Sequence, residues 1–357
     1  MPRRFHAPGR VNLIGGQVDY HEGWVVSMAI DHHVEVIATP RADGRVRARS
    51  HQSTFALDGP VDVAADGSED ARAVEPKWGR GVAGVVRVLA DLGRPATGAD
   101  LEIDSTLPIG AGLSSSAAFG VAVALALNDV AGFALPRLEL ALAAQRSEHA
   151  ASGVPCGTQD PLASVFGEAG HALLIDCRTL EITPLPIPAS LRVLVVHSGV
   201  PRTLEKTPYA QRRAESIAVG ARLGLRALRD ATLDQVRDEP RARHAVTEMA
   251  RVQAFGAALR DNDADALGPL MLASHASSRD DMEVSTPELD LLVDCLVESG
   301  ALGARLTGAG FGGCVVALVP AARADDIADT ATTAYRARSQ RDPTAWIVDA
   351  AAGAGPV

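Results

Sequence analysis

The segment Pro108–Phe119 places two glycines and three serines directly before an apolar stretch, in the order Pro-Ile-Gly-Ala-Gly-Leu-Ser-Ser-Ser-Ala-Ala-Phe. Gly110 and Gly112 allow backbone dihedrals that other residues rarely adopt, so the chain can approach a ligand closely there. The three serines supply hydroxyls and a helix N-cap, and residues 117–127 favour a helix. Because free N–H groups and the positive end of the helix dipole attract anions, the segment predicts a phosphate-binding loop.

This segment alone leaves an alternative open, namely an ordinary helix cap that follows a turn. It does not match the P-loop pattern of many nucleotide-binding proteins, because no lysine follows the second glycine. The choice between the two interpretations therefore depends on motifs elsewhere in the chain.

The composition is that of a globular protein, with 47% hydrophobic and 22% charged residues. At roughly 150 residues per domain, the 357-residue length predicts two domains. The net charge of -10 disfavours a nucleic-acid partner, which needs a basic face. No apolar run reaches the ~18 residues of a membrane span and no signal-peptide core follows the first residues, so we expect a cytoplasmic protein without a membrane partner. The four cysteines lack C-x-x-C spacing, which argues against a zinc site or a disulfide framework.

The N-terminal segment 6–20 combines an apolar element with a glycine break. Gly15-Gly16 ends the apolar residues 11–14 and would present Asp19 from a loop. A structural ion pair between Arg10 and an acidic neighbour is the alternative to a functional role for these charges.

Two strands are expected next, at residues 24–30 and 34–39, with a turn at Asp31-His32-His33 between them. Helices are expected at residues 78–92 and 135–151. Trp78, at the start of the first helix, is either a core residue or a platform for a purine ring. The second helix carries Glu148 near its end, and the Gly/Pro-rich loop after it carries one carboxylate, Asp160.

The Pro-rich link 184–188 is the predicted domain boundary, because long Ala/Arg/Leu helices follow it. These helices are expected at residues 209–231, 241–262, 264–277 and 287–299. A glycine-rich turn, 308–313, then separates two apparent strands. Its G-x-G-x-x-G pattern lacks the helix of a dinucleotide fold, so we expect a tight turn that brings backbone close to the neighbouring domain. The final Ala/Gly tail is expected to fray.

Three motifs occur in the order and spacing of a known family: Gly9–Gly15 with Asp19-Tyr20, Leu107–Ala117 and Gly308–Cys314. Together they resemble the galactokinase branch of the GHMP small-molecule kinases. The resemblance implies an α+β, two-domain GHMP kinase fold with the active site in the cleft between the domains. Residues 1–187 would form a ribosomal-S5-domain-2-like α/β domain and residues 188–357 a ferredoxin-like α+β domain.

The resemblance further implies an ATP-dependent sugar 1-kinase that phosphorylates the anomeric hydroxyl of galactose or a similar hexose. By this matching, Asp160 is the catalytic carboxylate and Arg10 the cation beside it, and Ser116 and Glu148 hold Mg²⁺. The ATP-binding residues would be Gly110, Ala111, Gly112, Leu113, Ser114, Ser115, Ser116 and, near the adenine, Trp78. The sugar-binding residues would be Arg10, Gly16, Gln17, Asp19, Gly157, Asp160 and Tyr209.

The chain departs from the family pattern at Gly16-Gln17-Val18, where galactokinases usually carry Glu-His-Thr before the Asp-Tyr pair. In the family the Glu-His pair contacts the far end of the sugar, around the C6 hydroxyl. Glycine at position 16 removes a hydrogen-bonding partner and leaves space, so selection at C6 should weaken.

Two alternative functions remain open, and the first of them follows from this departure. The first is a kinase for a C6-altered sugar (galacturonate, arabinose, an extended or deoxy hexose) or for an N-acetylhexosamine. The second is a non-catalytic ATP and sugar sensor, against which the presence of Ser115, Ser116, Ala117 and Asp160 argues. In each case the partner is a small-molecule sugar, and the protein is expected to be a monomer or a weak homodimer.

Overall fold

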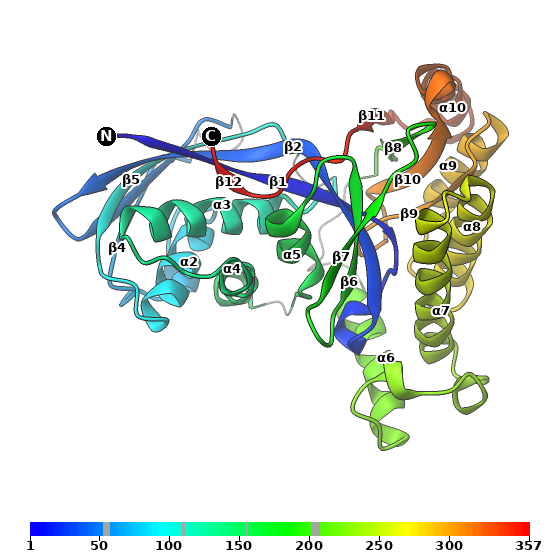
Figure 1. Ribbon diagram of the computed structural model, residues 1–357, viewed down its shortest axis with the longest axis horizontal. Helices are drawn as coiled ribbons and strands as arrows, with labels where there is room; N and C mark the ends of the chain where they lie inside the picture. Colours follow the sequence, from blue (N-terminus) through cyan, green and yellow to red (C-terminus); the bar gives the residue numbers. More distant parts are fainter. Residues whose placement is uncertain (53–57, 109–110, 154–155, 201–207) are drawn as a thin grey trace.

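The computed structural model describes residues 1–52, 58–108, 111–153, 156–200 and 208–357, and it contains two β-sheets with helices packed on them (Figure 1). The larger sheet has the strand order β12-β1-β2-β5-β3-β4, and β6 and β7 extend it beside β2. Its strands are β1 (Arg3–Ile14), β2 (Trp24–Arg41), β3 (Arg45–Ser50), β4 (Val61–Ala64), β5 (Gly98–Ser105), β6 (His171–Asp176), β7 (Ile182–Pro186) and β12 (Gly355–Pro356). All pairs are antiparallel except β3 with β5.

The predicted turn at residues 31–33 is wrong, because β2 is one continuous strand. β1 pairs with it on one side, while on the other side β6 pairs with residues 24–27 and β5 with residues 34–41. The two histidines lie where β2 changes partner. The register of β1 on β2 shifts between Pro8 and Arg10, and such irregularities redirect the side chains that follow them.

Four helices cover one face of the larger sheet (Figure 1): α2 (Gly79–Asp91), α3 (Ser115–Val130), α4 (Arg137–Ser152) and α5 (Gln159–Phe166). α3 is the central one, in contact with β1, β2, α2, α4 and α5. Its small apolar residues, among them Ala118, Ala122 and Ala126, are fully buried. An apolar surface on every side is what a helix in such a position requires.

The smaller sheet has the order β11-β8-β10-β9 and is antiparallel throughout. Its strands are β8 (Leu191–His197), β9 (Gly303–Leu306), β10 (Cys314–Pro320) and β11 (Thr344–Val348). It shares one apolar core with α9 (Pro287–Glu298) and α10 (Ala324–Ser339). Short 3-10 helices lie at η1 (Asp19–His21), η2 (Ala71–Ala73), η4 (Leu228–Asp230), η5 (Asp234–Val236) and η6 (Ala321–Arg323).

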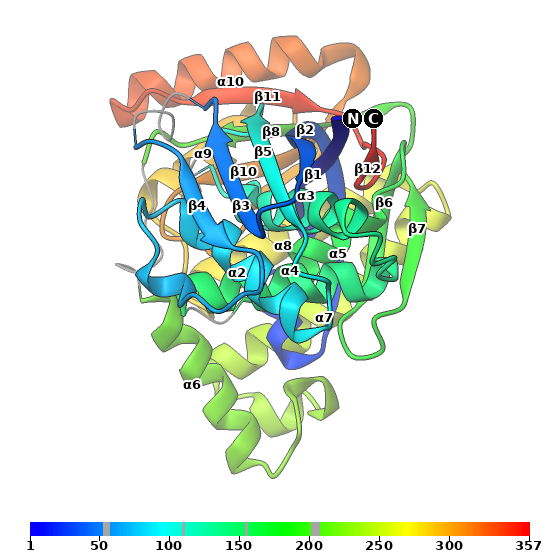
Figure 2. The same cartoon turned by 90° about the vertical axis from the view of Figure 1, so that its left-hand side faces the viewer.

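Three further helices lie between β8 and α9 in the chain: α6 (Tyr209–Arg222), α7 (Pro240–Arg260) and α8 (Ala264–Asp280). α7 packs on β2 and β7, and α8 packs on α7 and β9. α6 projects from one end of the molecule (Figures 1 and 2). It is shorter than predicted, because Gly224 adopts a positive φ of 67° just after its end, which is a common helix stop.

The chain leaves the larger sheet after β7 and enters the smaller sheet at β8. We propose 1–187 and 188–357 as the two domains on this basis. The C-terminal tail crosses back, since Gly355 and Pro356 pair with β1 and Val357 N–H donates to Arg4 O at 2.9 Å. The expected fraying of the tail is therefore wrong: the edge of β1 offers backbone partners that it uses. In the part of the chain that the structure describes, no helix is long and apolar enough to span a bilayer.

Candidate active site

The predicted phosphate-binding loop ends where α3 begins, and β1 holds it in place. Gly112 has a φ of 79° and Ser114 a φ of 58°, so both adopt left-handed conformations just before the helix. The guanidinium Nη1 of Arg10 donates to Gly112 O at 2.9 Å, and Arg10 N–H donates to Leu113 O at 3.1 Å. Ala111 and Leu113 are buried beneath the loop. Gly110 lies outside the described residues.

Arg10 and Asp160 form a bidentate ion pair at the centre of the site. Arg10 Nε lies 2.6 Å from Asp160 Oδ1, and Arg10 Nη2 lies 2.6 Å from Oδ2. Arg10 follows the register shift in β1 and is only 5% exposed, whereas Asp160 lies in the first turn of α5. This fork-to-fork geometry fixes the plane of the carboxylate.

The hydroxyl of Ser114 donates to Asp160 Oδ2 at 2.5 Å, so the loop also contacts the ion pair. This contact corrects one expectation, because the Ser114 side chain makes no capping hydrogen bond to α3. The predicted phosphate-binding loop and the predicted catalytic carboxylate are therefore joined by a hydrogen bond.

Three of the predicted sugar-contacting residues lie together beside this centre. A Cβ added to Gly157 would lie 1.5 Å from Asp19 Oδ2, so only glycine permits the observed approach. Desolvation, and then the charge of Asp160, raise the pKa of Asp19. Burial, and then the charge of Asp19, raise the pKa of Tyr209, the first residue of α6.

Gly16 lies against β9, and Gln17 lies against the turn that follows this strand. A Cβ on Gly16 would lie 2.5 Å from Nη2 of Arg305, which is fully buried on β9. The expectation that Gly16 leaves space is therefore corrected: a guanidinium occupies one side of it. Gln17 Nε2 lies 3.4 Å from Ala309 O, in the turn between β9 and β10.

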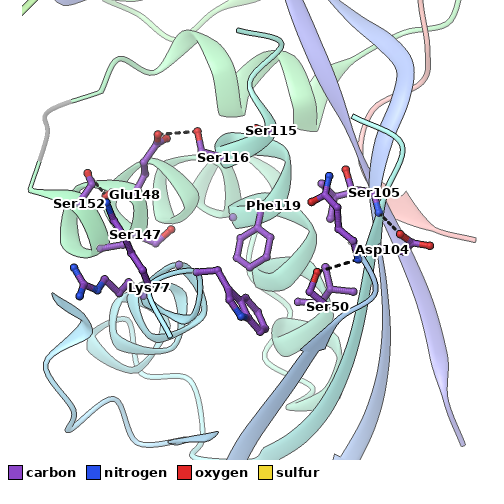
Figure 3. Close-up of a pocket in the computed structure, with 18 residues that line it drawn as sticks. Ser50, Lys77, Asp104, Ser105, Ser115, Ser116, Phe119, Ser147, Glu148 and Ser152 are labelled. Atoms are coloured by element: carbon purple, nitrogen blue, oxygen red, sulfur yellow. Dashed lines mark hydrogen bonds between the residues drawn. The ribbon is translucent and has the colours of Figure 1, made fainter. Parts of the chain in front are cut away.

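A cavity of about 520 Å³ adjoins the loop, between α2, α3, α4 and the edge of β5 (Figure 3). At its polar end Ser116 Oγ donates to Glu148 Oε1 at 2.8 Å. Burial, and secondarily the charge of Asp160, raise the pKa of Glu148. Trp78 also lines this cavity, so the structure brings it together with Ser115, Ser116 and Glu148.

Sequence reasoning did not assign Phe119, although this residue ends the glycine-rich segment. Its ring lies inside the cavity, between Lys77 on one side and Ser105 on the other (Figure 3). A Cβ on Gly81 would lie 2.9 Å from Phe119 Cε1, so the missing side chain at Gly81 makes room for the ring. An aromatic residue one turn after the serines of a phosphate-binding helix is a signal that could have found it.

The fold and this site correspond to a known class of enzyme. Two family models match the chain: the GHMP kinases N terminal domain over residues 80–168 and the GHMP kinases C terminal domain over residues 256–337. They define the chain as a GHMP kinase, a class that transfers phosphate from ATP. A third model, the galactokinase galactose-binding signature, matches residues 2–40.

Full-length relatives narrow the class. The chain is 42% identical to a galactokinase of Roseiflexus sp. (strain RS-1), over 98% of this chain and 92% of the relative. It is 40% identical to a galactokinase of Streptomyces coelicolor, with the same coverage. The crystal structure of Lactococcus lactis galactokinase complexed with galactose superposes with a TM-score of 0.94 at 29% identity, covering 100% of this chain and 95% of the other. The chain belongs to the galactokinase family and is a sugar kinase.

Proposed function

We propose that this protein transfers the γ-phosphoryl group of ATP to the anomeric hydroxyl of galactose. The ion pair between Arg10 and Asp160 carries the proposal, because it lies where two groups of predicted ligand-binding residues meet. The charge of Asp160 raises the pKa of Asp19 on one side and of Glu148 on the other. The names of the relatives and the galactose in the Lactococcus lactis complex support galactose as the sugar.

In this proposal Asp160 accepts a hydrogen bond from the anomeric hydroxyl and takes its proton as the sugar oxygen bonds to the γ-phosphorus. The bond between that phosphorus and the β–γ bridging oxygen breaks, and ADP leaves. Arg10 keeps the carboxylate in place and offsets negative charge that develops on the transferring group. Asp19, the Gly157 backbone and Tyr209 would bind other sugar hydroxyls.

Ser116 and Glu148 fit a magnesium ion, because their hydroxyl and carboxylate oxygens are hard ligands and already lie 2.8 Å apart. We propose that they hold Mg²⁺ at the polar end of the cavity, where the bound ion would neutralise phosphate charge. The loop from Gly110 to Ser116 would bind the triphosphate with its N–H groups, and Trp78 would lie beside the adenine.

A sugar with a C6 carboxylate is a second candidate substrate, because a cation lies near the departure at Gly16-Gln17. The guanidinium of Arg213 lies 5.0 Å from the centre of the Tyr20 ring and acts electrostatically on Asp19. The same cation offsets the charge of Asp19, which is a sufficient role when the sugar is neutral. The choice between galactose and galacturonate therefore depends on measured rates.

The test is sugar-dependent release of ADP over a panel of galactose, 6-deoxygalactose, galacturonate, arabinose and N-acetylgalactosamine, with phosphorus NMR of each product. We expect the highest kcat/KM with galactose and a product phosphorylated at C1. Because Gly16 supplies no side chain to bind a C6 hydroxyl, 6-deoxygalactose should be disfavoured by less than about a hundredfold.

Three outcomes contradict the proposal. A preference for galacturonate would assign the site around Gly16 and Arg213 to a carboxylate. Phosphorylation at a position other than C1, or no sugar-dependent ADP release from the whole panel, would overturn the assigned reaction.

A further inference from the structure

The carboxylate of Asp160 receives four hydrogen bonds, and one of its donors has no role in the proposed reaction. Oδ2 accepts from Arg10 Nη2 at 2.6 Å and from Ser114 Oγ at 2.5 Å. Oδ1 accepts from Arg10 Nε at 2.6 Å and from Gln159 Nε2 at 3.2 Å. An ionised carboxylate offers about four acceptor positions, so the set is complete. Gln159 is the unassigned donor.

Gln159 is the last link of a chain of buried hydrogen bonds that begins in the other sheet. Arg305 Nη1, on β9, donates to Asn12 Oδ1 on β1 at 2.8 Å. Asn12 Nδ2 donates to Gln159 Oε1 at 2.8 Å, and Gln159 then donates to Asp160. The three donors are 0%, 2% and 8% exposed, in the order Arg305, Asn12, Gln159. Water therefore cannot substitute for any of these links without a rearrangement.

The two ends of this chain fix the direction of every bond in it. Arg305 can only donate, and an ionised Asp160 can only accept. Asn12 must therefore turn its oxygen toward Arg305 and its NH₂ toward Gln159, and Gln159 must do the same one step further on. Neither amide can flip without placing two acceptors or two donors face to face. A buried series of hydrogen bonds that can run in one direction only favours a single arrangement of its side chains.

Residues of α7 and α8 hold Arg305 in place. Its Nε donates to Ser274 Oγ, on α8, at 3.0 Å, and its Nη2 lies 3.9 Å from Glu248 Oε1, on α7. Glu248 and Ser274 are both fully buried. Arg305, where this series of hydrogen bonds begins, therefore lies on β9 and is held by residues of α7 and α8. Asp160, where the series ends, lies on α5, a helix that covers the larger sheet.

We propose that Gln159 and Asn12 are positioning residues for Asp160, and that they tie the orientation of its carboxylate to the packing of the two sheets. The inference rests on the proposed function, in which Asp160 takes the proton of the sugar hydroxyl. Gln159 and Arg10 occupy both positions on Oδ1. Oδ2 then takes the substrate hydroxyl, because its second donor is the rotatable hydroxyl of Ser114.

The first test replaces Gln159 with methionine, which keeps the length of the side chain and removes its donor and acceptor. We expect kcat to fall about tenfold while KM for sugar and for ATP stays within twofold, because orientation changes and binding does not. Ser164→Ala is the matched control. Ser164 is buried on the same helix, and its hydroxyl donates to Pro8 O at 2.7 Å rather than to Asp160. Its kcat should stay within twofold.

The second test uses Asn12→Asp to reverse the direction of the hydrogen bond between residues 12 and 159. The new carboxylate keeps the contact with Arg305 but cannot donate to Gln159, so the Gln159 amide must turn its oxygen toward Asp160. We expect a larger loss of kcat than in Gln159→Met, together with a lower melting temperature, because Asn12 Nδ2 also donates to Ile14 O at 3.1 Å and the carboxylate cannot. In the double variant Asn12→Asp/Gln159→Met no reversed amide remains, so kcat should return to the Gln159→Met value.

Several results would overturn the inference: a kcat of Gln159→Met within twofold of the parent, an equal loss in Ser164→Ala, or losses that multiply in the double variant. A matching rise in KM would assign Gln159 to binding instead. If the parent protein phosphorylates no sugar, the proposed function fails, and crystal structures decide on the positioning. A carboxylate turned off Arg10 in Gln159→Met would then support it, and an unchanged carboxylate would refute it.

Discussion

The two halves of the candidate site are built in opposite ways. Around Asp160, side chains from β1, β9, α5 and the loop before α3 are joined by hydrogen bonds of 2.5–3.2 Å. Beyond Ser116 the site is instead a cavity of about 520 Å³, and the aromatic side chains of Trp78 and Phe119 are among its lining residues. The first half is thus a hydrogen-bonded network of side chains, and the second half is a cavity.

This contrast follows from what each half has to do. Phosphoryl transfer depends on charges held in place before the reaction, so the reacting groups need a rigid surround. A nucleobase is held mainly by apolar and stacking contacts, which tolerate small shifts. Changes near Asp160 should therefore lower kcat, and changes in the cavity should raise KM for ATP.

The largest effect is expected from Asp160→Asn. The amide cannot take the proton of the sugar hydroxyl, so kcat should fall by about a thousandfold or more. Isothermal titration should still detect sugar and ATP binding. A loss of kcat below tenfold would show that Asp160 does not take the proton. The proposed difference between the two halves of the site would then fail.

This variant needs a stability control, because it leaves the Arg10 guanidinium, only 5% exposed, without its counter-charge. Breaking a buried ion pair in this way typically costs about 3–5 kcal/mol. Rates should therefore be measured below the unfolding transition, which circular dichroism can locate for both proteins.

A smaller but still large effect is expected from Gly157→Ala. The added methyl group would overlap Asp19 Oδ2, at 1.5 Å, so Asp19 must leave its position. We expect kcat/KM for sugar to fall about a hundredfold while KM for ATP changes little. Gly220→Ala is the control, because the new Cβ would meet Leu228 at an ordinary 3.7 Å. Unchanged sugar kinetics in Gly157→Ala would show that Asp19 does not bind the sugar.

The cavity should respond differently, as Phe119→Ala can show. Removing the ring takes away a stacking surface, so KM for ATP should rise about tenfold while kcat and KM for sugar stay within twofold. Phe119→Tyr keeps the ring face and should restore the parent KM. A fall in kcat at saturating ATP would mean that the cavity is as tightly coupled to the chemistry as the region of Asp160.

The sequence predicted the cavity half of the site better than the half around Asp160. The glycine-rich segment predicted the loop and α3. The family resemblance assigned Trp78, Ser116 and Glu148 to the binding of ATP and Mg²⁺, and in the structure these residues line one cavity. These residues are informative because each lies at the start or end of a helix that periodicity can locate. In the fold, the continuous β2 and the pairing of β12 with β1 were missed, since both depend on partners distant in sequence.

The network behind Asp160 was missed for a related reason. Asn12 and Gln159 stand inside or beside recognised motifs, yet nothing in their spacing shows that their amides meet. Arg305 lies 293 positions from Asn12, and only the packing of β9 against β1 brings them together. The sequence likewise did not show that the Arg305 guanidinium lies close to Gly16. Long-range polar contacts of this kind have no local sequence pattern.

The smallest predicted effect concerns pH and the Mg²⁺ site that we propose at the polar end of the cavity. Burial raises the pKa of Glu148, so this carboxyl takes up a proton at a higher pH than an exposed glutamate does. A protonated carboxyl is a poor ligand for Mg²⁺, because a ligand must be deprotonated to bind. The affinity for Mg²⁺ should therefore be highest at pH values well above that pKa, and it should decline as the pH falls through the pKa.

The measurement is the Mg²⁺ concentration that gives half-maximal rate, at fixed saturating ATP and sugar, between pH 8 and pH 5. We expect this concentration to rise severalfold toward the acid end. In Glu148→Gln it should be higher throughout and nearly independent of pH, because the titrating ligand is gone, while Ser116→Ala should raise it and keep the pH dependence. Equal pH dependence in the parent and in Glu148→Gln would show that Glu148 does not bind Mg²⁺. Phosphate oxygens and water would then have to supply the ligands in its place.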